Sequence, residues 1–243
     1  MRSRVPFGIK NLDEMIDGGI PEGNQVIVAG GPGAGKTLLS FEYLYNNAKK
    51  GNISVLFSLE EESATIIDNA KSAFSDFKDI DELIKAGTLN IYGMESNTAY
   101  FSKDADTGSY SFTNWLSNLQ TVIESKNATR VAIDSVSVLK IFIRDSFDYR
   151  NTTIQLINVL KNMKVTSLIN TELETGDKNR MVFQPEFFIY DGIIAMYLMG
   201  EGNNMVQTLE VIKMRGTYHS FNTVPYEITS SGIRVLGLPQ NNR

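Results

Sequence analysis

One eight-residue stretch of this chain has the residue types and the spacing that suit binding of a phosphate group. Residues 30–37 read GGPGAGKT, a glycine-rich run that ends in a lysine and a threonine. Glycines let successive backbone N–H groups turn toward one anion, because no Cβ atom stands in the way. In the spacing G-x-x-x-x-G-K-[ST], the lysine reaches the β- and γ-phosphates of a nucleotide and the hydroxyl binds Mg²⁺. We therefore expect Lys36 and Thr37 to hold a magnesium–nucleotide complex.

The segments on either side of this loop supply the context that it needs. Residues 25–29 form a short apolar run that predicts one buried strand, and residues 36–49 carry an apolar stripe that predicts a helix. The amino end of a helix presents unpaired N–H groups and partial positive charge to phosphates. This order of strand, loop and helix favours nucleotide binding over a glycine-rich turn that binds nothing.

Three acidic side chains stand where they could assist phosphate chemistry. Glu60 and Glu61 follow the apolar run 55–59, and Asp134 follows another such run. In open α/β sheets, ligands gather outside the carboxyl ends of the strands. Asp134 therefore suits a water-mediated contact to Mg²⁺, and Glu60 or Glu61 could orient the water that attacks the γ-phosphate. The structural alternatives are a turn cap for Asp134 and, for the glutamates, stabilisation of the helix that Ser63 is predicted to cap.

A pair of cations stands at the end of a predicted strand over residues 205–213. Lys213 and Arg215 alternate with Met214, so the two cations point to one face of the strand and Met214 to the other. Such a pair could clamp phosphate. From the spacing alone, a solvated strand end is an equally good interpretation.

The other hydrophobic patterns predict a single α/β domain over residues 1–243. Up to Thr171, strands alternate with helices, which predicts a mostly parallel sheet covered on both faces. Later runs predict an antiparallel extension at one edge of that sheet. The aperiodic residues 93–111 predict a long, mobile surface loop, and Trp115 is predicted to lie in the core. The further predicted elements are helices within 5–24 and over 63–74, 79–86, 112–126 and 150–163, and strands over 88–92, 130–135, 165–170, 187–190, 193–199 and 224–236.

The composition of the chain argues against several classes of function. Of the 243 residues, 42% are hydrophobic and 21% are charged, which is typical of a globular domain with a sizeable core. The net charge of −5 argues against a generally basic surface for nucleic acid. Without cysteine there is no disulfide, no cysteine-bound zinc and no thiol nucleophile, and a single histidine argues against a histidine metal centre. The longest apolar run, residues 193–199, is too short to span a bilayer, so we expect a cytoplasmic protein.

These motifs together resemble the KaiC family, a branch of the RecA superfamily of P-loop ATPases. The resemblance is carried by GIxxLDxxIxGGIP (8–21), GGPGAGKT (30–37), FSLEE (57–61), VAIDSVSVL (131–139) and EVIKMRGTYH (210–219). It covers residues 5 to 236 in order and is weakest across 93–111. The chain is similar to the single-domain KaiC-like ATPases that are common in archaea. This resemblance implies a RecA-like fold.

The resemblance also implies a homo-oligomeric, hexamer-like ring with ATP or ADP and Mg²⁺ at the subunit interfaces. Glu60 and Glu61 match the family's pair of catalytic glutamates. Lys36 and, from the neighbouring subunit, Arg215 match further catalytic positions. Thr37 and Asp134 match the metal-binding positions. The positions that match nucleotide contacts are Pro32, Gly33, Ala34, Gly35, Lys36, Thr37, Leu38, Ser72, Lys213, Met214, Arg215, Thr217 and His219.

Two other functions stay open at this point, and one activity of the family is in doubt. The chain could be a nucleotide-gated switch or scaffold that recruits a protein partner and turns over little ATP. It could also be a RecA-type recombination or repair ATPase, although its acidic charge does not favour nucleic acid. Autokinase activity is in doubt because the region 172–188 has no adjacent Ser/Thr pair in a matching place; Thr171 and Thr175 stand apart.

Overall fold

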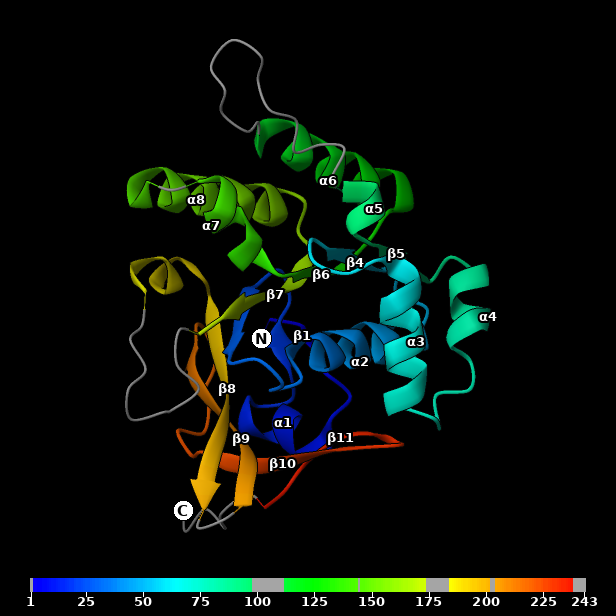
Figure 1. Cartoon of the computed structure of the whole chain (residues 1–243), viewed down its shortest axis with the longest axis vertical. Helices are drawn as coiled ribbons and strands as arrows, with labels where there is room; N and C mark the ends of the chain where they lie inside the picture. Colours follow the sequence, from blue (N-terminus) through cyan, green and yellow to red (C-terminus); the bar gives the residue numbers. More distant parts are fainter. Residues whose placement is uncertain (1, 98–111, 144, 174–183, 202–203, 238–243) are drawn as a thin grey trace.

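A nine-stranded sheet forms the centre of the described chain. The structure, a computed structural model, describes residues 2–97, 112–143, 145–173, 184–201 and 204–237 (Figure 1). The strands of the sheet are β3 (Gln25–Gly30), β4 (Ser54–Ser58), β5 (Leu89–Tyr92), β6 (Arg130–Asp134), β7 (Thr166–Glu172), β8 (Gly192–Glu201), β9 (Asn204–Met214), β10 (Val224–Thr229) and β11 (Gly232–Val235). Their spatial order is β11-β10-β9-β8-β3-β7-β6-β4-β5, and the strands from β8 to β5 are parallel. The predicted mostly parallel sheet is confirmed.

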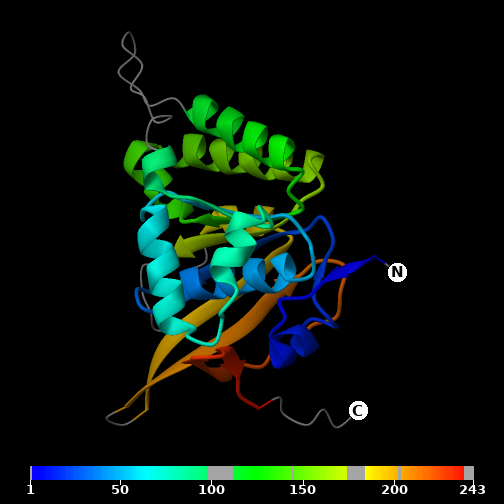
Figure 2. The same ribbon diagram turned by 90° about the vertical axis from the view of Figure 1, so that its right-hand side faces the viewer.

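Helices cover both faces of this sheet, as Figures 1 and 2 show. The helices are α1 (Lys10–Met15), α2 (Lys36–Ala48), α3 (Ser63–Ala73), α4 (Ile80–Lys85), α5 (Met94–Asn97), α6 (Phe112–Lys126), α7 (Leu139–Phe142) and α8 (Ser146–Asn162), with short 3₁₀ helices η2 (Val136–Val138) and η4 (Pro185–Ile189). A small ladder of β1 (Arg4–Val5) and β2 (Ile20–Pro21) flanks α1. One apolar core lies between the sheet and α1, α2 and α3, and the other lies under α6 and α8. Trp115 is buried in the second core, as predicted.

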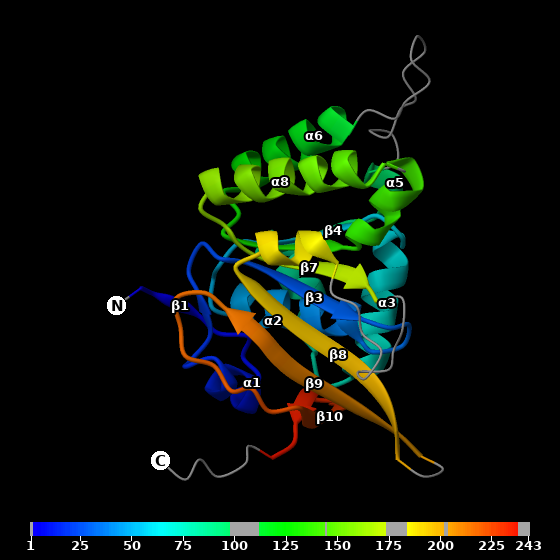
Figure 3. The same cartoon turned by 90° about the vertical axis from the view of Figure 1, so that its left-hand side faces the viewer.

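The antiparallel extension is also confirmed, with two corrections to its parts (Figure 3). Residues 187–190, predicted as a strand, lie largely in η4, which Pro185 opens at its first turn. The predicted strand 224–236 is a hairpin of β10 and β11, since the chain reverses before Gly232, whose φ of +116° favours glycine.

Local hydrogen bonds explain where other elements differ from their predicted bounds. Helix α8 begins four residues before the predicted start at 150, because the Asp145 carboxylate accepts the N–H groups of Phe147 at 2.8 Å and Asp148 at 3.0 Å. Ser63 is the first residue of α3 and not its cap; its hydroxyl donates to Glu95 at 2.6 Å.

The predicted loop over residues 93–111 extends outside the described ranges. Helix α5 occupies the start of the predicted loop 93–111, and residues 98–111 of that loop lie outside the described residues. Among the residues that the structure does describe, no helix has the length and apolar character needed to cross a membrane.

A buried carboxyl group on α2 makes the stability of the fold depend on pH. Glu42 is 4% exposed and accepts the Ile233 N–H of β11 at 2.7 Å. Burial raises the pKa of Glu42 from 4.5 to about 7. Between these two values the folded chain keeps a proton that the unfolded chain releases, so the free energy of unfolding falls as pH rises through this window. Across the whole window the free energy of unfolding falls by about 3 kcal/mol.

We expect Glu42→Gln to remove most of this dependence, because the amide stays neutral and its oxygen can accept the same N–H. Chemical denaturation at pH 4.5 and pH 8 should find the variant close to wild type at the lower pH and more stable at the higher one. The exposed Glu14, changed to Gln, is the matched control and should shift neither value. A stability difference that does not grow with pH would contradict the assignment.

Candidate functional site

The loop predicted to bind phosphate, called the phosphate-binding loop below, lies between the carboxyl end of β3 and the amino end of α2. Gly33 and Gly35 have φ angles of +74° and +80°, which glycine adopts without strain and which turn the backbone into a loop. Pro32 and Gly33 are exposed, whereas Ala34 is buried beneath them. The Lys36 ammonium group donates to the carbonyls of Gly30 and Gly31 at 3.0 and 3.1 Å, so it lies against the loop itself.

Strand pairing brings the predicted acidic residues to the same end of the sheet. Ser58 of β4 pairs with Asp134 of β6, and the Leu59 N–H donates to the Asp134 carbonyl at 2.6 Å. The Thr37 hydroxyl donates to the Asp134 carboxylate at 2.5 Å. Helix α2 and strand β6, almost a hundred positions apart in the chain, therefore present two oxygen ligands at one point.

The chemistry of these ligands fits Mg²⁺. A hydroxyl and a carboxylate are oxygen donors of the kind that Mg²⁺ prefers, and this ion usually takes its other ligands from water and substrate phosphates. Among the described residues there is no group of three or more His, Cys, Asp or Glu side chains that could hold a metal ion alone. Thr37 and Asp134 therefore suit an ion that arrives with a nucleotide.

Glu60 and Glu61 lie beside this pair but face different surroundings. The Ser58 hydroxyl accepts the N–H of Glu61 at 2.9 Å and forms the turn that follows β4. Glu60 accepts a hydrogen bond from the Ser135 hydroxyl. Glu61 instead accepts one from the Asn69 amide of α3 at 3.2 Å. Glu60 is thus the glutamate held against the strand that carries Asp134.

The surroundings of Glu60 also change its acidity. The residue as a whole is exposed, but its carboxyl group is partly withdrawn from water beside Ser135. This partial burial raises the pKa of Glu60 above its ordinary 4.5, and the charges of Asp134 and Glu172 act in the same direction, while the Ser135 hydrogen bond opposes them. A carboxylate with a raised pKa and a free face is suited to accept a proton from water.

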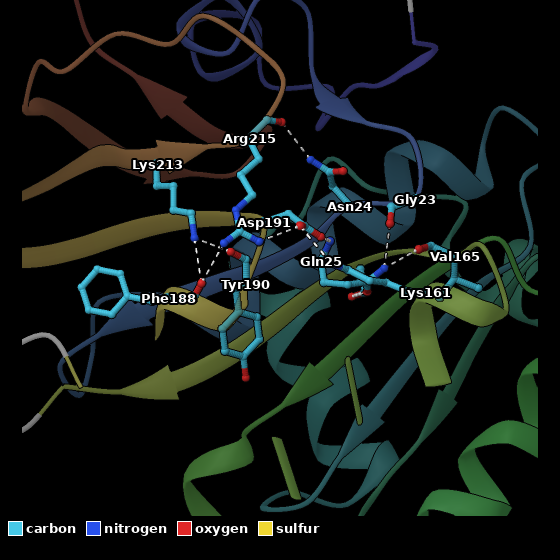
Figure 4. Close-up of polar contacts among 11 residues, drawn as sticks. Gly23, Asn24, Gln25, Lys161, Val165, Phe188, Tyr190, Asp191, Lys213 and Arg215 are labelled. Carbon is cyan, nitrogen blue, oxygen red and sulfur yellow. Dashed lines mark hydrogen bonds and ion pairs between the residues drawn. The ribbon is translucent and has the colours of Figure 1, made fainter. Parts of the chain in front are cut away.

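The predicted cation pair is held by η4 and by the two residues between η4 and β8, as Figure 4 shows. The Lys213 ammonium group donates to the carbonyls of Phe188 and Tyr190 at 3.1 and 2.6 Å. The Arg215 guanidinium group donates to the Phe188 carbonyl at 3.1 Å and pairs with the Asp191 carboxylate at 3.4 Å. Partial burial, and next the charge of Arg215, lowers the pKa of Lys213.

The cation pair lies at the opposite end of the sheet from the phosphate-binding loop. Met214 pairs with Gly192, and Gly192 pairs with Val26, near the start of β3. The loop follows the other end of β3, which is six residues long. The two ends are about 17 Å apart along the strand. Within one chain, the structure therefore brings Lys36, Thr37, Glu60 and Asp134 together and keeps Lys213 and Arg215 away from them.

The remaining predicted nucleotide contacts divide between surface and core. Ser72 is exposed on α3, and Leu38 is half-buried on α2. The Met214 side chain packs in the core. Thr217 is half-buried, and His219 is buried with its ring 4.5 Å from that of Phe221. Thr171 is buried, whereas Thr175 lies outside the described residues.

Three residues at these sites have roles that the sequence analysis missed. Ser135 binds Glu60, Asp191 binds Arg215, and the Tyr226 hydroxyl of β10 donates to the Ala34 carbonyl under the loop. Ser135 follows Asp134 directly, so its position after a strand was a usable signal. Tyr226 reaches the loop from a strand 192 positions further along the chain, and only the fold reveals that contact.

Comparisons with known proteins identify the family and the fold of this chain. A family model for the KaiC ATPases matches residues 5–240. A UPF0273 protein of Pyrococcus horikoshii is 32% identical over 97% of this chain and 94% of its own length. The circadian clock oscillator protein KaiC of Picosynechococcus is 32% identical over 95% of this chain but only 44% of its own length. The crystal structure of a KaiC-like protein from Pyrococcus horikoshii superposes with a TM-score of 0.81 at 28% identity, covering 98% of this chain and all of that one.

The family model, the relatives and the solved structure all extend over nearly the whole described chain, and the phosphate-binding loop lies inside the matched region. The chain therefore belongs to the KaiC family of ATPases and has the RecA-type fold of an ATP-binding domain.

Proposed function

We propose that this protein is a Mg²⁺-dependent ATPase whose active site is completed between two copies of the chain in a ring. The observation that supports this most is the separation of the two groups of residues. The loop, Glu60 and Asp134 lie at the carboxyl ends of the parallel strands, and Arg215 lies at the amino ends. A head-to-tail arrangement of subunits joins one end of a sheet to the opposite end of the next, and such arrangements close into rings.

In this proposal each residue has a defined task. The N–H groups of the loop and the Lys36 ammonium group bind the phosphates. To do so, Lys36 replaces its hydrogen bonds to the Gly30 and Gly31 carbonyls with bonds to phosphate oxygens. Glu60 orients the attacking water and accepts its proton. Arg215 and Lys213 of the neighbouring subunit stabilise the charge that develops on the γ-phosphate. Thr37 and Asp134 would hold Mg²⁺, which would supply positive charge to the phosphates.

Light scattering after size exclusion, with and without MgATP, tests the proposal when phosphate release is measured on the same samples. We expect assembly into one closed oligomer together with steady phosphate release, and loss of phosphate release in Lys36→Ala. Assembly without turnover would replace the proposal with a nucleotide-gated switch. A salt-sensitive, tight complex with single-stranded DNA would instead favour a recombination ATPase, because counterion release makes such binding weaken with salt.

A further inference from the structure

A single buried carboxylate lies behind the Arg215 guanidinium group. Asp191, between η4 and β8, is 7% exposed. One carboxylate oxygen accepts the Gln25 N–H at 3.1 Å, at the first residue of β3. The other oxygen contacts both the Lys161 ammonium group at 3.0 Å and the Arg215 guanidinium group at 3.4 Å (Figure 4). The bond to Gln25 thus sets the direction in which the second oxygen faces the two cations.

Arg215 is held by its main chain and by one edge of its guanidinium group. Its N–H donates to the Asp191 carbonyl at 2.8 Å, and its own carbonyl accepts the Asn24 amide at 3.2 Å. The guanidinium group then meets the Phe188 carbonyl and the Asp191 carboxylate, yet 54% of the side chain is exposed. The main chain and one edge of the side chain are fixed, and the rest of the side chain is accessible from outside the subunit.

We infer that Asp191 is a positioning residue that aims Arg215 at the active site of the neighbouring subunit. This inference rests on the proposed function of Arg215. A long arginine side chain loses rotamer entropy when it is ordered, and a fixed carboxylate behind it means that this ordering precedes the encounter with phosphate. The same carboxylate is bonded to the first residue of β3, the strand that leads to the subunit's own phosphate-binding loop. Asp191 is therefore bonded to the start of the strand whose other end leads to the subunit's own loop, while its second oxygen faces the cation proposed to serve the neighbouring subunit.

Lys161 is the other cation on this carboxylate and offers a matched control. It comes from α8 and lies beside a cavity of about 650 Å³ that Asn24 and Asp191 also line. Removing its charge leaves Arg215 as the partner of that oxygen. Lys161→Gln is therefore expected to keep turnover near the wild-type value, whereas a change of Asp191 is not.

A double-mutant cycle of Asp191→Asn and Arg215→Ala tests the inference. Asparagine keeps the shape of the side chain and can still accept the Gln25 N–H, so ATP binding and the melting temperature should stay close to wild type. The turnover number should fall on the order of tenfold or more, because small misplacements of a catalytic group cost that much. In the Arg215→Ala background the same change should have no further effect, since residues that act as one unit are not additive.

The outcomes separate this inference from the function on which it rests. If Arg215→Ala keeps its turnover, the proposed function fails. If Arg215→Ala loses turnover but Asp191→Asn does not, or if the two losses multiply, only the positioning role of Asp191 is overturned. Should Asp191→Asn fold poorly, Asp191→Glu provides the test, because it keeps the charge but moves it by one methylene group. Full turnover in a folded Asp191→Glu protein would then count against the inference.

Discussion

Replacing Arg215 by alanine is expected to lower ATP turnover by about three orders of magnitude while nucleotide binding stays largely intact. A cation that neutralises charge on the γ-phosphate in the transition state contributes about 10³ or more to the rate. Binding is spared because the loop and Lys36 hold the phosphates, whereas Arg215 of the neighbouring subunit acts on charge that develops in the transition state. Phosphate release at saturating MgATP and equilibrium binding of a fluorescent ATP analogue measure the two effects separately. Unchanged turnover in Arg215→Ala would remove Arg215 from the mechanism.

Mixing two inactive variants shows whether Arg215 acts across the interface. A Lys36→Ala subunit has a disabled loop but an intact Arg215, and an Arg215→Ala subunit has the reverse. In a head-to-tail ring assembled at random from equal amounts, about a quarter of the interfaces combine an intact loop with an intact arginine. We therefore expect the mixture to recover about a quarter of the wild-type turnover, by the same counting of interfaces. Co-assembly without recovery would mean that Arg215 serves its own subunit.

The residues at the loop end of the sheet could be predicted because each belongs to a local pattern. Lys36 and Thr37 are part of one contiguous motif, and Glu60 and Asp134 each follow an apolar run directly. In a parallel sheet, the carboxyl ends of all strands lie at the same end of the sheet. Locating the apolar runs was therefore enough to group the residues that follow them. The strand order that the structure adds, with β4 and β6 adjacent, places Glu60 next to Asp134.

The other end of the sheet could not be assembled in this way. The pattern around Lys213 and Arg215 predicts the end of a strand. It does not predict whether that strand end lies at the amino or the carboxyl ends of the parallel strands. Strand β9 runs antiparallel to β8, and this reversal puts its last residues at the amino ends of the parallel strands. Two cationic partners of the Asp191 carboxylate lie 24 and 30 positions away in the chain, directly after β9 and on α8. No periodicity relates positions on separate elements, so such a cluster becomes visible only in the fold.

Glu60 and Glu61 are expected to differ in their effect on turnover, although the sequence places them as an equivalent pair. Glu60→Gln should reduce the turnover number by about 10² to 10⁴, the usual contribution of a general base. Glu61→Gln should cost far less, because that carboxylate faces Asn69 on α3 and not the strand that carries Asp134. Glu61→Gln is also the matched control for the loss of one negative charge at this position. Equal losses in the two variants would contradict the assignment of Glu60 as the base.

The pH dependence of turnover should identify the same residue. Glu60 accepts a proton only while it is ionised, so turnover should fall as pH decreases through its pKa. The pKa of Glu60 is raised above the ordinary 4.5, which places this acid limb at a higher pH than an exposed glutamate would give. The Ser135 hydrogen bond lowers that pKa, so Ser135→Ala should move the acid limb further up. If the limb of Ser135→Ala instead coincided with that of wild type, the group that titrates would not be Glu60, and the water would have to lose its proton elsewhere.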